Sequence, residues 1–294
     1  MNWIAITLVA AFLQNVRSSL QKALSSRLST AGATSARFIY GAPFALIWLA
    51  GVRIATGESF PVPGAESLVF LAIGAVSQIV ATFLLIASFR HAPFAVGTAL
   101  SKTESLQAAA FSGIVLSEHV SALGWAGLVL GLAGVFLLVH GPKGSVTLRG
   151  ALVAVLSGSA FAVSAVAYRG ASLALGDASV VLRASMILVA AISLQTGLMA
   201  FWLIWREPGE MSRVLKAWRS TVPTALAGVA ASAGWFMAMT LQQVAYVRAL
   251  AQIELAFSTL TGVFFFGETL TARDLAGVIL IGLSVVLVLF AAAG

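Results

Sequence analysis

Cysteine is absent from this 294-residue chain, and charged residues make up only 9% of it. Without a thiol, disulfides, thiolate metal sites and cysteine catalysis are excluded. Soluble domains contain about 25% charged and about 45–50% apolar residues. Because 60% of this chain is hydrophobic, a water-soluble globular protein is excluded as well. The 17 Lys and Arg exceed the 10 Asp and Glu, but most of the cations fall where loops are expected, which argues against a nucleic-acid partner.

Residues that carry out hydrolysis or metal chemistry are also rare. The chain has 3 histidines, all near expected span ends. Its sequence contains no HExxH metalloprotease motif, no GxSxG elbow and no phosphate-binding P-loop. We therefore expect no catalytic site, metal or cofactor. An integral-membrane enzyme is the alternative from another functional class, and it would need a metal or nucleophile cluster that the sequence does not offer.

Apolar runs recur along the whole chain, from Trp3 to Ala293. A helix needs about 20 residues to cross a bilayer, so the runs predict an all-α integral membrane protein with ten transmembrane helices and short loops. The one clearly polar connection runs from Arg206 to Arg219. The expected spans cover residues 3–22, 33–52, 66–89, 93–116, 121–140, 148–168, 179–204, 221–243, 245–267 and 272–292.

An internal repeat emerges when the sequence is shifted by 150 residues, because the shift places Glu104 on Glu254 and Glu118 on Glu268. Rare residues that pair at one offset indicate duplication, with residues 1–143 and 144–294 as two five-helix repeats. Because five is odd, the second repeat enters the membrane from the opposite side. Such inverted repeats are typical of secondary transporters, and alternating access follows from the symmetry.

Lys and Arg gather in the odd-numbered connections between spans, above all in the one from Arg206 to Arg219. By the positive-inside rule these connections face the cytoplasm, so both termini are predicted on the non-cytoplasmic side. A bacterial inner membrane is the expected location.

The first span carries Gln14 and Arg17 on one helical face together with Thr7. We expect this face to line a water-filled cavity, since Gln14 is too short to reach the membrane surface. Arg17 lies closer to the span end, and snorkelling to the interface is its alternative role.

Further polar positions occur in the third and eighth spans. Gln78 stands in the third span, and the eighth carries Ser232, Trp235, Met239 and Gln242 on one face. Substrate contact and ordinary helix packing are the two interpretations of this aromatic and methionine stripe.

Two charged residues stand in the middle of the fourth span. An ionised side chain at that depth costs about 3 kcal/mol on insertion scales, so Lys102 and Glu104 need partners or water. They differ by roughly 200° around the helix, so they do not both point into one cavity. We assign Lys102, with the adjacent Ser101, to substrate and Glu104 to a neighbouring helix or a proton path, although the reverse assignment also fits.

The ninth span has Gln252 and Glu254 at the equivalent positions, with Arg248 one turn earlier on the face of Gln252. For Glu104 and Glu254 the two hypotheses are an ion pair or hydrogen bond that joins helices, and proton coupling. Arg248 contacts substrate or snorkels to the interface.

The starts of the fifth and tenth spans carry capping signals. Ser121 and Thr271 are predicted N-caps, and Asp274 completes a capping box with Thr271. The fifth span also has four glycines that permit close helix packing, inside the monomer or in a homodimer: Gly124, Gly127, Gly131 and Gly134.

Residues 104–118 and 254–271 resemble the duplicated signature of EamA-type members of the drug/metabolite transporter superfamily. In that family the signature runs from a Glu-Pro pair to a Gly-Glu pair before the last helix of each repeat. In this chain Ser105 and Leu255 replace the prolines, and Ser117 replaces the first glycine.

The resemblance implies a basket of ten helices, in which the first four of each repeat line a central cavity and the fifth and tenth pack outside. The charged positions of the family carry over to six residues of this chain: Glu104, Glu118, Glu254, Glu268, Arg37 and Arg183. Glu118 and Glu268 stand just before the fifth and tenth spans, where negative charge also has a structural role in stabilising the start of a helix.

The predicted function is a secondary transporter that exports small polar metabolites. Cations and amides suit a carboxylate or phosphate, and a membrane glutamate suits an ammonium group, so amino acids are the first expectation. Carriers of anionic metabolites such as organic or sugar phosphates, and drug exporters, are the alternatives. The expected partners are a small-molecule substrate, the lipid bilayer and protons. The candidate substrate contacts are Gln14, Arg17, Gln78, Ser101, Lys102, Trp235, Met239, Arg248 and Gln252.

Overall fold

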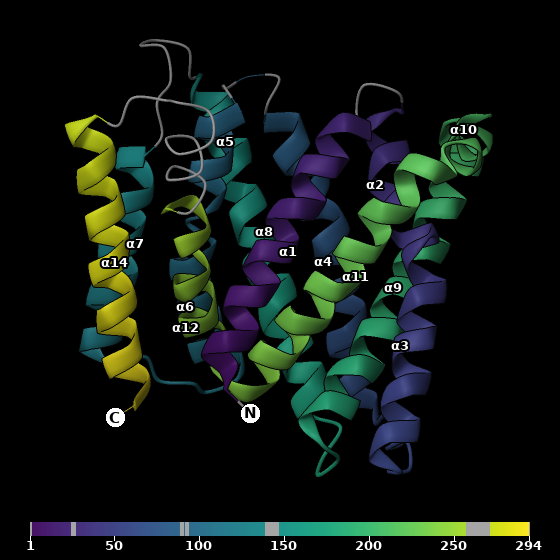
Figure 1. Ribbon diagram of the computed structural model, residues 1–294, viewed down its shortest axis with the longest axis horizontal. Coiled ribbons are helices and arrows are strands. Elements are labelled where there is room, and N and C mark those ends of the chain that lie inside the picture. The colour runs from purple at the N-terminus through teal and green to yellow at the C-terminus, as the bar shows by residue number, and fades with distance from the viewer. Residues whose placement is uncertain are drawn as a thin grey trace. The chain divides into compact units, whose positions relative to one another are not determined.

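The computed structural model describes residues 2–24, 28–88, 91, 94–138, 147–256 and 271–293, and all the regular structure in them is helical (Figure 1). Apart from the ninth, of which residues 257–267 lie outside the described part of the chain, each expected span corresponds to one helix or to two consecutive helices. The helices are α1 (Trp3–Leu24), α2 (Thr30–Ile39), α3 (Gly41–Thr56), α4 (Ala65–Ser88), α5 (Phe94–Ser101), α6 (Glu104–Val115), α7 (Ala122–Leu138), α8 (Leu148–Leu173), α9 (Val180–Arg206), α10 (Glu210–Lys216), α11 (Trp218–Leu241), α12 (Val244–Ala251) and α14 (Ala272–Ala293).

Among the described residues, 6 helices are long and apolar enough to cross a membrane. One of them, Ala31–Thr56, combines α2 and α3, and the others are α4, α8, α9, α11 and α14. Shorter apolar helices cover Trp3–Arg17 and Ala122–Leu138. These helices confirm an all-α, multi-pass membrane protein, and the number of ten crossings stays a prediction.

The helices pack into two compact units. Unit 1 comprises residues 1–79 and 167–241, and unit 2 comprises residues 80–166 and 242–294. Each unit contains helices from both predicted repeats. The compact units therefore do not coincide with the sequence halves 1–143 and 144–294.

In unit 1, α1 lies along α11 (Figure 1). The Trp235 indole Nε1 donates a hydrogen bond of 2.9 Å to Oε1 of Gln14. The two backbones approach closely at Gly234, where an added Cβ would lie 2.8 Å from the Cβ of Ala10. Small residues at such a crossing let membrane helices pack by van der Waals contact.

The second and seventh expected spans, α2–α3 and α9, run antiparallel within unit 1. Beside the start of α2, the backbone N–H of Ser29 donates to Oε1 of Glu210 at 2.5 Å. Beyond the end of α3, Glu58 Oε2 accepts a bond of 2.8 Å from the backbone N–H of Ser179, the N-cap of α9. Hydrogen bonds from the backbone and the hydroxyl of Ser179 lower the pKa of Glu58 below its ordinary value.

The fifth and tenth expected spans, α7 and α14, pack against each other in unit 2 and are also antiparallel. Ser284 Oγ donates a bond of 2.7 Å to the carbonyl oxygen of Gly127. A Cβ at Gly134 would lie 2.8 Å from the carbonyl oxygen of Gly277. The glycines of α7 therefore serve packing within the chain.

Hydrogen bonds confirm the predicted caps of these two helices. Thr271 N donates to Oδ2 of Asp274 at 3.0 Å, and Asp274 N donates to Oγ1 of Thr271 at 3.2 Å, which is the reciprocal capping box. Ser121 Oγ accepts a bond of 3.2 Å from the backbone N–H of Gly124. Glu268 lies outside the described residues.

Candidate functional site

The fourth and ninth expected spans are interrupted at equivalent positions, both in unit 2. The turn of Lys102 and Thr103 separates α5 from α6, and Gln252 separates α12 from the helical residues that follow. Lys102 N donates to the carbonyl oxygen of Ala99 at 3.0 Å, and Gln252 N donates to that of Ala249 at 3.1 Å. Bonds over three residues are typical of a 3₁₀ turn, which often marks a functional hinge.

Serine and threonine hydroxyls accompany the interruption between α5 and α6. The hydroxyls of Ser101, Thr103 and Ser105 each donate to the carbonyl oxygen three residues earlier, at 2.7, 2.7 and 3.2 Å. Hydroxyls that bond back to the preceding turn bend helices. Gly158 of α8 also allows a close approach here, since an added Cβ would lie 2.6 Å from the carbonyl oxygen of Ser101. The helix is thus interrupted although Ser105 replaces the proline of the family signature.

Two crossed ion pairs join the interrupted segments. Lys102 Nζ lies 3.8 Å from Oε2 of Glu254, and Arg248 Nε lies 3.0 Å from Oε1 of Glu104. The four side chains are between 12% and 21% exposed, so their attraction is screened less than at a protein surface. Each glutamate therefore takes part in an ion pair between the two segments, which is one of the two hypotheses drawn from the sequence. Lys102 and Arg248, predicted to contact substrate, face carboxylates of the chain itself.

The third contact between these segments is polar but uncharged. Gln252 Nε2 donates a bond of 3.0 Å to Oγ of Ser105. The Gln252 side chain is buried, and its Oε1 lies against Gly131 of α7, where an added Cβ would displace it. Gln252 therefore contacts protein groups of α6 and α7 in this conformation.

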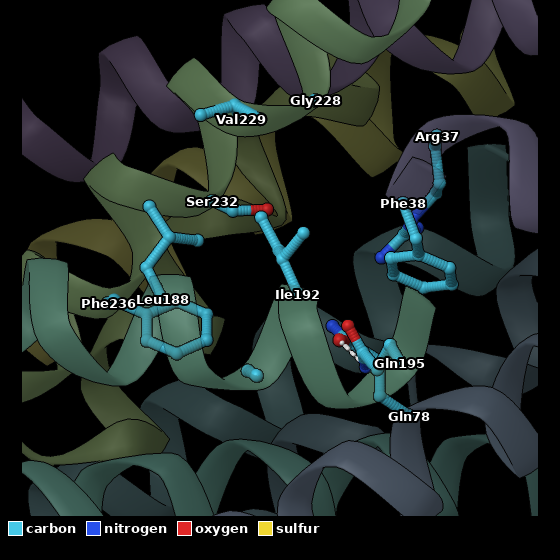
Figure 2. Close-up of a pocket in the computed structure, with 11 residues that line it drawn as sticks. Arg37, Phe38, Gln78, Leu188, Ile192, Gln195, Gly228, Val229, Ser232 and Phe236 are labelled. Atoms are coloured by element: carbon cyan, nitrogen blue, oxygen red, sulfur yellow. Dashed lines mark hydrogen bonds between the residues drawn. The ribbon is translucent and has the colours of Figure 1, made fainter. Parts of the chain in front are cut away.

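Unit 1 contains a narrow pocket among α2, α4, α9 and α11 (Figure 2). As the helices stand, it holds little more than a water molecule. Its polar lining consists of Arg37, Gln78, Gln195 and Ser232. Its apolar lining includes Phe38, Leu188, Ile192 and Phe236.

Hydrogen bonds hold the two amides of this pocket in place. Gln195 Nε2 donates to Oε1 of Gln78 at 2.7 Å (Figure 2). The Tyr168 hydroxyl donates to the same oxygen at 3.1 Å. The Tyr168 ring lies 4.5 Å from the ring of Phe236, tilted by 38°. These contacts join α4, α8, α9 and α11.

Arg37 brings a positive charge to the pocket. Its Cζ lies 4.4 Å from the centroid of the adjacent Phe38 ring. The carboxylate ion pairs among the described residues involve other cations and do not include Arg37. Arg17 of α1 lies nearby, because a Cβ at Gly228, which lines the pocket, would be 3.3 Å from Cδ of Arg17.

The predicted site residues are thus divided between the two units. In unit 1, Gln78 lines the pocket, Arg17 lies beside it, and Gln14 and Trp235 bond to each other. The carbonyl oxygen of Met239 accepts a bond from the Arg169 guanidinium. The other members lie in unit 2: Ser101, Lys102, Glu104, Arg248, Gln252 and Glu254.

The sequence did not predict that Gln195 and Phe236 line the pocket, or that Tyr168 bonds to its two amides. Gln195 could have been predicted from the sequence, since it is an amide in the middle of an apolar span, as Gln78 is. The sequence did not distinguish Tyr168 and Phe236, because aromatic residues are common in membrane helices. Arg183, singled out with Arg37 by the family resemblance, donates instead to the carbonyl oxygen of Gly176 at 2.8 Å.

Comparison with known proteins identifies the family. A model of the EamA-like transporter family matches residues 1–140 and 148–290. A solved structure described as "Crystal structure of protein" has a TM-score of 0.72 and 18% identity, and the match covers 99% of this chain and 97% of that one. This likeness shows the fold alone, and no curated protein matches significantly. Because the family match spans almost the whole chain, the protein belongs to the EamA-like transporter family.

Proposed function

We propose that the protein is a secondary transporter that exports small polar metabolites across a bacterial inner membrane by alternating access. The observation that carries the proposal is the pair of interrupted helices with the ion pairs Lys102–Glu254 and Arg248–Glu104. Charged residues within membrane segments are expensive and mark substrate or ion pathways. Interrupted helices at corresponding places of two repeats are typical of transporter sites. Family membership agrees with this function.

Amino acids are the first substrate class to test. The Arg37 guanidinium suits a carboxylate, and the Gln195 amide oxygen and Ser232 hydroxyl of the same pocket can accept bonds from an ammonium group. The second candidate class is anionic metabolites without an ammonium group. The two cations at this pocket, Arg17 and Arg37, favour that class and disfavour cationic drugs.

Counterflow in proteoliposomes tests the proposal. Vesicles with purified protein are loaded with one unlabelled amino acid and diluted into the same labelled compound, and organic acids, sugar phosphates and a lipophilic cation are tested in parallel. We expect transient, saturable uptake of labelled amino acids that protein-free vesicles do not show. Counterflow of the lipophilic cation alone, or of none of the compounds, would contradict the proposal.

We also propose protons as the coupling ion, with Glu254 as a carrying residue. A carboxyl group facing Lys102 releases that cation when it takes up a proton. The Glu254→Gln variant should keep counterflow and lose accumulation driven by a pH gradient. The control is Glu66→Gln, at the exposed start of α4. Accumulation that survives in Glu254→Gln would remove Glu254 from coupling.

A further inference from the structure

We infer that the pocket of unit 1 is a carboxylate subsite, in which Arg37 holds the acid group and the wall at Phe236 receives an apolar group of the solute. The inference rests on the proposed transport function and names the chemical class of its substrate. It concerns only helices α2, α4, α9 and α11 of unit 1.

The first step is the charge of Arg37. A guanidinium is charged at neutral pH, and its fork of N–H groups matches the two oxygens of a carboxylate. This guanidinium lies over the Phe38 ring, and a π-face compensates a cation only in part. Among the described residues, the carboxylate ion pairs leave Arg37 without an anionic partner. A substrate carboxylate supplies the missing negative charge.

The second step is the fixed polar wall. Gln78 Oε1 accepts bonds from both Gln195 and Tyr168, so the amides are held in one orientation before a solute binds. Preorganised polar groups lower the entropic cost of binding. The Ser232 hydroxyl adds a further donor and acceptor from α11.

The third step is the apolar side. Figure 2 shows Arg37 and Phe38 on one side of the pocket, and Leu188 and Phe236 on the other. A solute with a carboxylate at one end and an apolar group at the other matches this division, whereas a sugar phosphate would place hydroxyl groups on the apolar wall. Because the pocket is narrow as the helices stand, binding must widen it, and the alternating states of a transporter allow for such a change.

Four probes that share one phenyl group test the inference: phenylalanine, 3-phenylpropionate, 2-phenylethylamine and phenylalaninamide. Thermal unfolding of the detergent-purified chain is measured against the concentration of each probe. We expect the two carboxylates to raise the melting temperature and the amine and the amide to leave it unchanged. Equal stabilisation by the amine, or no stabilisation by any probe, overturns the inference.

Substitutions then locate the site. Arg37→Gln should weaken binding of the carboxylates at least about tenfold, since a hydrogen-bonded charge is lost. Arg53→Gln is the matched control, because Arg53 lies in the same helical segment, Ala31–Thr56, with its Cζ 5.8 Å from the Phe60 ring and outside the pocket. It should keep the wild-type affinity. Unchanged affinity in Arg37→Gln overturns the inference.

A second variant covers the case that Arg37→Gln does not fold. Gln78→Glu keeps an oxygen that accepts from Gln195 and Tyr168 and adds a negative charge to the pocket, so it should also abolish carboxylate binding. Wild-type affinity in this variant counts against the inference. Counterflow separates the two proposals. Transport of other compounds without carboxylate binding would contradict only the carboxylate subsite. Carboxylate binding without any transport would contradict only the proposed function.

Discussion

The charged residues of the interrupted spans compensate one another across two helices. Lys102 pairs with Glu254 and Glu104 pairs with Arg248, so each segment contributes one cation and one anion. Each charge would be expensive alone in a membrane. Such a symmetric arrangement permits a direct test, because a charge can be exchanged between partners without changing the net charge.

We expect Lys102→Glu to lower the free energy of unfolding by about 2–4 kcal/mol, because it leaves two carboxylates facing each other in a part-buried place. Adding Glu254→Lys should restore most of this loss by re-forming the pair in the opposite sense. Thermal unfolding followed by tryptophan fluorescence measures both variants.

Arg149→Glu serves as the control for this exchange, because Arg149 is exposed at the start of α8. It should change the melting temperature little. If the double variant is no more stable than Lys102→Glu alone, the pair does not contribute to stability as its geometry indicates.

At the scale of the helices, local chemistry decides where spans are interrupted or end. Hydropathy predicts continuous helices over 93–116 and 245–267, because apolar residues run through both. The structure interrupts both at positions 150 residues apart, with three-residue backbone bonds on each side. Hydropathy does not register such interruptions, since a window of about 19 residues averages the few polar residues of the turn with the apolar residues around them.

The end of α6 provides a prediction at this scale. Ser117 has a φ of 54°, the left-handed conformation that costs a residue with a Cβ roughly 1–2 kcal/mol. The family signature has glycine at this position, which agrees with that conformation. We expect Ser117→Gly to raise the melting temperature and Ser117→Val to lower it, as measured by thermal unfolding.

Ser77→Gly is the control for this prediction, because Ser77 lies inside α4. Glycine there should destabilise the helix by about 0.5–1 kcal/mol. A lower melting temperature for Ser117→Gly as well would show that the backbone at residue 117 does not require the left-handed conformation.

At the scale of the whole molecule, the equivalent spans of the two sequence halves pack in antiparallel pairs. This holds for α3 with α9 in unit 1 and for α7 with α14 in unit 2, where α6 also packs against α12. Antiparallel equivalents are what an inverted repeat predicts. Because each compact unit takes helices from both halves, a cut near residue 143 would divide both units.

The orientation in the membrane is testable because the chain has no cysteine. Ser59 and Ser212 are exposed and lie beyond opposite ends of the antiparallel pair α2–α3 and α9. The positive-inside rule predicts that Ser59→Cys reacts with a membrane-impermeant maleimide in intact cells, and that Ser212→Cys reacts only after permeabilisation. The opposite pattern would place both termini in the cytoplasm.

The sequence by itself determined the membrane class, the approximate spans, the duplication and the family. These features follow from hydropathy, from rare residues and from spacing along one dimension, so no knowledge of neighbouring helices is needed. The cost of a charge within a membrane segment also indicated that Lys102 and Glu104 need partners or water.

Only the tertiary structure decided which partners they have. Lys102 finds Glu254 from a helix far along the chain, and Arg37 shares a pocket with Gln78 and Gln195 from two other helices. A periodic pattern defines the face of a helix but not the helix that this face meets. That choice depends on the packing of all the helices at once, which small residues such as Gly131 and Gly158 permit by close contact.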